Sequence, residues 1–283
     1  MTAAGSYPIR EFARLTGVNP VTLRAWERRY GIIQPLRTPK GHRYYSDEHV
    51  SQVKDILYWL DQGYPIRQVK LLLTEPPSTA EAPADDWSNM IQRMLKGACE
   101  LNSRAIDEEL NAGLASYPMA VFYDRCLMPV LSTLRQDPQR QMIQQNFSYL
   151  LQRKLAQLIC LQQKHAEGPL LLIATNHSEG AIHMLAAAYA LGAAGFRVEF
   201  FGPSLTTEQL MITAQIINAS WIWAHLHPSD SNELQQWQRM VTEAGLPVYF
   251  SGATPQGLPD DLHLQDSIGR QIQGFIQTAG SKL

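Results

Sequence analysis

The sequence predicts a multidomain α/β protein in which a small helical head, a helical bundle and an alternating strand-helix body follow one another. Amphipathic helical periodicity fills residues 1–73, apolar residues recur at helical spacing over 87–166, and a continuous apolar run opens an alternation of strands and helices from 167 to 283. At 283 residues the chain has room for two or three domains. We therefore expect domains over these three ranges, with a linker at 74–86.

The head is organised around residues 19–45, which read NPVTLRAWERRYGIIQPLRTPKGHRYY. Asn19 is a favoured N-cap and Pro20 suits the first helical position, so a helix begins here. This helix has an apolar back and a cationic front, which suits the DNA major groove because arginine binds guanine acceptors there. After Gly31, two prolines, a Lys-Gly turn and an aromatic run predict a hairpin with charge at its tip.

Further amphipathic helices surround this stretch. We expect one at Pro8–Thr16, which pairs with the helix at Pro20 as a helix-turn-helix, one from Ser46 to Gly63, and a short one at Ile66–Leu73. The head carries eleven Lys/Arg against six Asp/Glu, and the rest of the chain carries thirteen against twenty. A net charge of +5 on the head and −7 on the remainder predicts a polyanion partner for the head alone.

The candidate DNA contacts lie on the helix at Pro20 or on the hairpin, and they carry hydrogen-bond donors. They are Thr22, Arg24, Arg28, Arg29, Lys40, His42, Arg43 and Tyr44. A merely solvated face is the alternative for the three helix arginines, but their density beside a cationic hairpin favours contact with phosphates and bases. Trp26 is expected in the core, because aromatic residues supply most of the burial in so small a domain. Tyr45 is expected to pack beneath the hairpin.

The run TLRAWERRYG, followed by a basic hairpin that ends in GHRYY, resembles the winged helix-turn-helix of MerR-family transcription regulators over residues 6–73. The resemblance implies a sequence-specific regulator that binds double-stranded promoter DNA as a homodimer or higher homo-oligomer. One recognition helix would enter each major-groove half-site, and the wings, with Arg43 and Tyr44, would hold flanking phosphates. Metal-sensing relatives use paired cysteines, which this sequence lacks, so a metal-responsive regulator is not expected.

A semi-rigid linker, TEPPSTAEAPADD, is expected at 74–86. Beyond it, four blocks of apolar residues at helical spacing predict a four-helix bundle over 87–166. The three cysteines lie far apart in apolar helical settings and are expected to be buried, reduced thiols. They are Cys99, Cys126 and Cys160.

From residue 167 the pattern changes, and LLLIAT at 170–175 is a continuous apolar run typical of a buried parallel strand. Because strands and helices then alternate, we predict a doubly wound, Rossmann-like sheet with any ligand at the carboxyl ends of the strands. The other strands are expected at 196–201, 221–226 and 246–251, and the helices at 180–194, 206–218, 232–244 and 266–278.

The order of these parts and the segment GFRVEFFGPSLT, at 195–206, resemble a branch of the MerR family that carries a cobalamin-binding module of the methionine-synthase type. The resemblance implies four candidate cofactor-binding residues. His177 and Gly180 match the spacing of the module's acid-x-His-x-x-Gly loop, and Ser251 and Gly252 match its small-residue turn.

Two departures from that branch argue against the cofactor. Thr175 stands where the loop has the acid that orients the histidine, and the bundle lacks the Glu-His pair of the light-responsive members. We therefore expect a sensory and oligomerisation module that is degenerate for cobalamin, with a regulatory protein partner as its input and His177 as a solvent-facing loop residue. The alternative is an adenosylcobalamin-dependent, light-sensing transcription repressor.

The remaining histidines give no metal site from spacing alone. His225 and His227 put two imidazoles on one face of a strand end, but no third ligand accompanies them at a suitable spacing, so a hydrogen-bonded pair is expected. His183 is expected to be an ordinary helix residue.

Enzymatic and membrane functions are not expected. The sequence has no nucleophile elbow, P-loop or G-x-G-x-x-G, so no catalytic residues are assigned. No apolar run approaches the roughly 18 residues of a membrane span, and residues 1–5 lack a signal-peptide pattern. A cytoplasmic protein without membrane contact is the resulting expectation.

Overall fold

The computed structural model describes residues 5–74, 86–137, 140–164, 166–203, 205–227, 231–253, 259, 262–264 and 267–280. It divides into two units, Met1–Leu150 and Leu151–Leu283. The expected division at 1–73, 87–166 and 167–283 stays a prediction, and most of the expected linker, 75–85, lies outside the described residues. Among the described residues, every helix is too short or too polar to span a bilayer.

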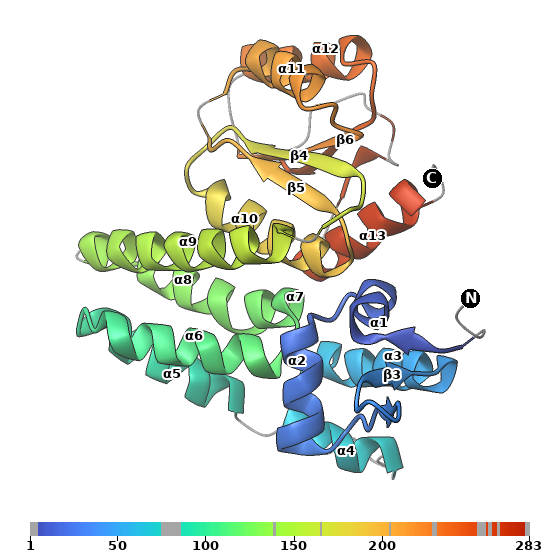
Figure 1. Cartoon of the computed structure of the whole chain (residues 1–283). Helices are drawn as coiled ribbons and strands as arrows, with labels where there is room; N and C mark the ends of the chain where they lie inside the picture. The colour runs from blue at the N-terminus through green and yellow to red at the C-terminus, as the bar shows by residue number, and fades with distance from the viewer. Residues whose placement is uncertain are drawn as a thin grey trace. The chain divides into compact units, whose positions relative to one another are not determined.

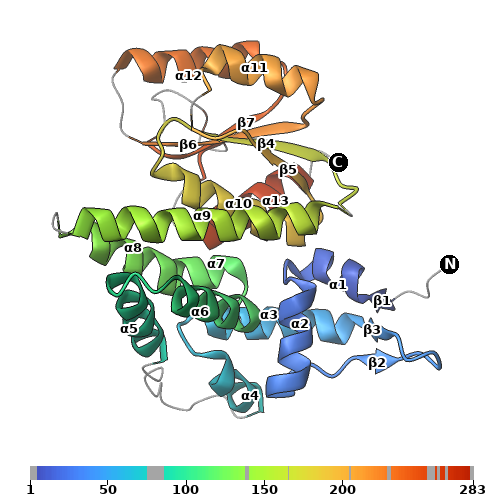
Figure 2. The same cartoon turned by 60° about the vertical axis from the view of Figure 1, so that its left-hand side comes forward.

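The head of the first unit is a set of short helices with a small antiparallel sheet in the order β1-β3-β2 (Figure 2). Its elements are β1 (Tyr7–Pro8), α1 (Ile9–Thr16), α2 (Pro20–Ala25), a π-helical turn (Trp26–Tyr30), β2 (Leu36–Arg37), β3 (Arg43–Tyr45), α3 (Asp47–Asp61) and α4 (Ile66–Thr74). The Asn19 side chain accepts a hydrogen bond from the Val21 N–H, so this residue is the N-cap that the sequence predicts.

Aromatic residues form the core of this head, as expected. Trp26 and Tyr45 are fully buried, and the ring of Tyr45 stacks on Phe12 with centroids 4.0 Å apart. This stack joins α1 to β3. It therefore fixes the position of the hairpin made by β2 and β3 relative to the two helices before it.

The rest of the first unit is helical. It contains α5 (Asp86–Cys99), α6 (Ser103–Ser116), α7 (Met119–Phe122), a π-helical turn (Tyr123–Leu127), α8 (Met128–Arg135) and the start of α9 (Gln141–Gln163), which continues into the second unit. The expectation of three buried cysteines is wrong for two of them. Cys126 is buried, but Cys99 and Cys160 lie on solvent-facing positions of α5 and α9.

The second unit is the predicted doubly wound domain, with four parallel strands in the order β5-β4-β6-β7 (Figure 1). Helices α10 and α13 cover one face of the sheet, and α11 and α12 cover the other (Figure 1). Its elements are β4 (Leu170–Thr175), α10 (Gly180–Ala193), β5 (Arg197–Phe200), α11 (Thr207–Ile216), β6 (Trp221–Leu226), α12 (Ser231–Glu243), β7 (Val248–Gly252) and α13 (Ile268–Gly280).

Alternate residues of the central strand β6 serve the two faces, as the period of a strand requires. Ile222 belongs to the core beneath α11 and α12, together with Trp237. Trp223 points to the other face, where its ring stacks on Phe275 of α13 with centroids 5.8 Å apart. Both faces of the sheet are therefore packed around β6, and this packing fixes where the loops after the strands begin.

Candidate functional site

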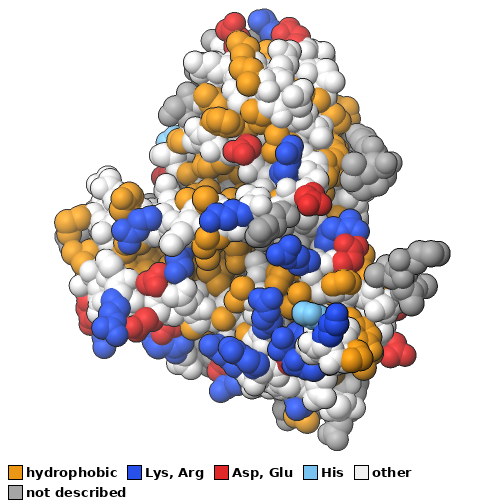
Figure 3. All heavy atoms as spheres, in the orientation of Figure 1, with side chains coloured by type: hydrophobic (Ala, Val, Ile, Leu, Met, Phe, Trp, Pro, Cys, Tyr) orange, Lys and Arg blue, Asp and Glu red, His pale blue; other side chains and the backbone are white. Residues whose placement is uncertain are grey.

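A cationic groove lies between α1, α2 and the wing, which is the hairpin at 36–45. Its volume is about 930 Å³. Arginines from three separate segments line it, namely Arg10 from α1, Arg24 from α2, and Arg37 and Arg43 from the wing. Lys and Arg side chains also gather over this part of the surface in Figure 3. Such a concentration of guanidinium groups suits phosphate oxygens, which arginine binds through two parallel N–H donors.

The recognition helix, which comprises α2 and the π-helical turn at 20–30, has the two faces that the sequence predicts. Arg24, Arg28 and Arg29 are exposed. Leu23 and Trp26 are buried beneath them. The helix is therefore fixed to the head by its buried side, and its cationic side faces solvent.

Thr22 does not join this cationic face. Thr22, Trp26 and Tyr30 share one side of the recognition helix at a spacing of four, and that side packs against α6. The buried Thr22 hydroxyl donates to the Leu114 carbonyl at 2.9 Å, and the Trp26 Nε1 donates to the Ser116 carbonyl at 2.8 Å. In this structure Thr22 is therefore buried against α6, whereas the sequence predicts it among the exposed DNA contacts.

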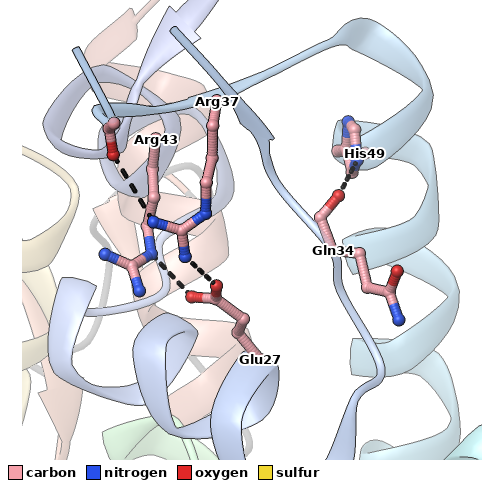
Figure 4. A network of polar contacts seen from close by, with 6 residues as sticks. Glu27, Gln34, Arg37, Arg43 and His49 are labelled. Atoms are coloured by element: carbon pink, nitrogen blue, oxygen red, sulfur yellow. Dashed lines mark hydrogen bonds and ion pairs between the residues drawn. The ribbon is translucent and has the colours of Figure 1, made fainter. Parts of the chain in front are cut away.

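Glu27 ties the wing to the recognition helix (Figure 4). Its carboxylate accepts from Arg37 at 2.7 Å and from Arg43 Nε at 2.6 Å. Partial burial alone would raise the pKa of this carboxyl, but the hydrogen bonds and charges of the two arginines outweigh burial and hold the pKa below its ordinary value. Arg43 is therefore a positioning contact of the wing, and its guanidinium keeps further N–H donors for a ligand.

The tip of the wing is a tight turn with exposed side chains. Gly41 has a φ of +81°, which favours glycine, and its N–H donates to the Thr38 carbonyl at 2.8 Å. Lys40 and His42 are exposed beside this turn, and His42 and Tyr44 line the groove. Their role as DNA contacts stays a prediction.

Sequence reasoning missed two arginines of the groove, Arg10 and Arg37. Arg10 belongs to a helix that was expected to be mainly structural. It reaches the groove because β1, just before it, pairs with the wing strand β3 through Tyr7 and Tyr45. Its only sequence signal was a basic residue at the start of an amphipathic helix, and such a residue is commonplace.

Comparison with known proteins decides the nature of the head. Residues 7–75 match the family described as MerR HTH family regulatory protein. The head is a MerR-type helix-turn-helix domain. The transcriptional regulator MlrA of Salmonella typhimurium (strain SL1344) is 46% identical over 72 residues, but this match spans only 25% of this chain and 30% of MlrA.

Similarity beyond the MerR-type head is more distant. The transcriptional repressor CarH of Myxococcus xanthus is 26% identical over 274 residues, which cover 89% of this chain and 90% of CarH. The structure of the Methanosarcina barkeri monomethylamine corrinoid protein has a TM-score of 0.48 at 13% identity, over 69% of this chain and 100% of that one.

The loop between β4 and α10 holds His177 through its backbone. The Thr175 hydroxyl donates to the His177 carbonyl at 3.1 Å and accepts from the His177 N–H at 3.3 Å. The imidazole is exposed, and its Nδ1 accepts from the Glu179 N–H at 3.3 Å. Both of these Thr175 hydrogen bonds thus go to the backbone of His177. In the cobalamin-binding loop that the sequence resembles, the acid at this position orients the ring of the histidine.

The turn at Ser251 and Gly252 is engaged with the protein itself. The buried Ser251 hydroxyl accepts from Trp223 Nε1 at 2.9 Å and lies 2.9 Å from His225 Nδ1. A Cβ on Gly252 would meet the Leu226 carbonyl oxygen at 2.2 Å, so the glycine serves close packing of two strands. Both residues are thus engaged in contacts within the sheet.

A stacked imidazole pair fills the adjoining end of the sheet. His225 stacks on His183 with centroids 4.1 Å apart, and His183 Nε2 lies 2.8 Å from the Gln271 side-chain oxygen. Burial lowers the pKa of His183 to about 4 and that of His225 to about 2, so both rings are neutral near pH 7. His183 is therefore part of an internal cluster, in contrast to the ordinary helix residue that the sequence predicts.

Proposed function

We propose that this protein is a sequence-specific, DNA-binding transcription regulator of the MerR type. The observation that carries the proposal is the arginine-lined groove beside an exposed cationic helix, in a domain of MerR type. In a homodimer, each recognition helix would present Arg24 and Arg28 to base edges in one half-site. The wing would hold phosphates with Lys40 and Arg43.

The packing of the recognition helix on α6 limits how DNA can approach. Base edges can meet the exposed arginines directly, whereas the side with Thr22 faces the bundle. Full insertion of the helix into a major groove about 12 Å wide would separate this side from α6. We further propose that the helices after the head and the α/β domain receive the signal and form the oligomer. A regulatory protein that binds them would supply that signal.

A selection experiment tests this function. The full chain is incubated with random DNA duplexes, bound duplexes are recovered over several rounds, and the recovered pool is sequenced. We expect one enriched motif with dyad symmetry, because a symmetric dimer places two recognition helices about one helical turn apart. A recovered pool with the same composition as the input would contradict sequence-specific binding.

A second candidate function is an adenosylcobalamin-dependent, light-sensing repressor. It is favoured by the exposed imidazole of His177, three residues before Gly180, at the carboxyl end of β4. We propose the cofactor-independent regulator first, because Thr175 stands where the cobalamin-binding loop has an acid and because the Ser251 hydroxyl is buried and bonded within the sheet.

An absorbance measurement separates the two candidates. The protein is incubated in the dark with adenosylcobalamin and passed through a size-exclusion column before and after green light. We expect a colourless protein whose elution volume does not change with light. A cobalamin spectrum that travels with the protein, or a light-dependent change of size, would support the second candidate instead.

A further inference from the structure

We infer that His177, Glu179 and His227 form a binding site for a divalent transition-metal ion of the Zn²⁺ class. The possible ligand atoms of these three side chains, one from each, all lie within 4.8 Å of one another. The site lies in the α/β domain at the carboxyl end of the sheet. It is separate from the proposed DNA contacts and does not depend on them.

The register of the sheet brings the two histidines together. β4 and β6 are neighbouring parallel strands, and Thr175 stands opposite His225 in the ladder. His177 and His227 each follow two residues later, so they leave the sheet side by side. The strands on either side of this pair, β5 and β7, extend the sheet in opposite directions. This is the switch point of a doubly wound sheet, where ligands bind preferentially.

A side-chain amide locks this arrangement. The Asn176 side chain donates to the His227 carbonyl at 3.2 Å and accepts from the His227 N–H at 2.8 Å. The residue before one candidate ligand therefore holds the backbone of the other. As a result, the two imidazole centroids are 5.2 Å apart. The edge of His225, itself fixed by Ser251, packs against His227 with centroids 5.5 Å apart.

The third donor comes from the start of α10. Glu179 directly precedes the first residue of that helix, Gly180, and its side chain is exposed. The His177 ring is also exposed and makes a long hydrogen bond of 3.3 Å to the Glu179 N–H. Either nitrogen of this ring can become a ligand after a small rotation, at the cost of that one hydrogen bond.

The donor set indicates the class of metal. Two imidazoles and one carboxylate suit Zn²⁺ and its neighbours in the transition series, whereas Ca²⁺ and Mg²⁺ prefer oxygen ligands alone. With metal–ligand bonds of about 2.0–2.2 Å, the three donor atoms must approach to roughly 3.5 Å of one another. The exposed side chains of His177 and Glu179 can make this movement toward the anchored His227. Three protein ligands leave a fourth position for water or a small anion.

The test uses the full chain without a polyhistidine tag and measures Zn²⁺ binding by competition with a chromogenic chelator. We expect one Zn²⁺ per chain, with affinity reduced at least tenfold in each of the variants His177→Ala, Glu179→Gln and His227→Ala. The matched control is Glu208→Gln, which changes an exposed glutamate in the first turn of α11 in the same domain. This control should bind Zn²⁺ like the unaltered protein.

Co²⁺ provides a second readout, because its visible absorption reports the number and type of ligands. We expect bands of a four-coordinate site in the unaltered protein and their loss in the variants. Zn²⁺ uptake that is equal in the unaltered protein and the three variants, or no uptake at all, would overturn the inference. Circular dichroism checks folding, and if His227→Ala unfolds the domain, the two exposed positions decide the result.

Discussion

Replacing Arg24 by Ala should weaken binding to the selected DNA by roughly tenfold to a hundredfold, which corresponds to a loss of about 1–3 kcal/mol for one bidentate arginine–base contact. Arg24 is exposed on the recognition helix and also lines the groove, so its guanidinium can reach both base edges and phosphates. Arg28→Ala should act in the same direction, because Arg28 is exposed one helical turn further along. Fluorescence anisotropy with a labelled duplex measures both effects.

Arg14→Ala is the matched control for this prediction. Arg14 is exposed on α1 and paired with Glu11 at 2.6 Å, and it is not among the residues that line the groove. Its loss removes the same charge from the same domain and should change the affinity far less. All three variants should keep the circular dichroism spectrum of the unaltered protein, because each side chain is exposed. Wild-type affinity in Arg24→Ala would remove that residue from the interface.

Those parts of the fold that depend on residues within a single helix or strand could be predicted from the sequence. The N-cap at Asn19 set the start of the recognition helix, and the buried positions of Trp26 and Tyr45 followed from the burial that aromatic residues must supply in a small domain. The continuous apolar run at 170–175 became β4, one of the two inner strands of the sheet, and it is buried along its whole length. Each of these signals lies within one element, so distant contacts were not needed to interpret it.

The candidate sites were only partly predictable, because they depend on contacts between distant elements. The burial of Thr22 arises from α6, more than 90 residues later in the chain, and no local pattern reveals it. The role of Glu27 was hidden for the same reason, since its partners Arg37 and Arg43 reach it only when the wing folds back.

The histidines of the α/β domain show the same limit. Spacing along the chain gave His225 and His227 no third metal ligand. The pairing of β4 with β6 then placed His177 and Glu179 beside His227, about 50 residues away in sequence. A search for ligand spacing within one segment cannot find a site that is assembled from two strand ends.

The affinity for DNA should also depend steeply on salt. Each phosphate that the protein neutralises releases condensed counterions, which makes log K fall with log salt at a slope of about −0.9 per contact. The groove offers four arginines per head, and a dimer doubles the number. Glu27 compensates part of the charge of Arg37 and Arg43, so fewer than eight full contacts are expected from the groove, and Lys40 and the exposed helix arginines add to them.

With about six to ten phosphate contacts per dimer, the affinity should fall by roughly 10³- to 10⁵-fold between 50 and 200 mM salt. If the Arg24 guanidinium contacts a phosphate, Arg24→Ala should make the slope less steep. If it contacts a base, the slope should stay unchanged and the protein should discriminate less between DNA sequences. Arg14→Ala should retain both the slope and the preference of the unaltered protein.

A salt titration of the full chain on its selected duplex shows whether the arginine-lined face of the MerR-type head binds DNA. We expect a straight line of log K against log salt with a slope of roughly −5 to −9 for the dimer. An affinity that stays flat across the same salt range would contradict it, because a surface that neutralises phosphates cannot bind DNA without releasing counterions.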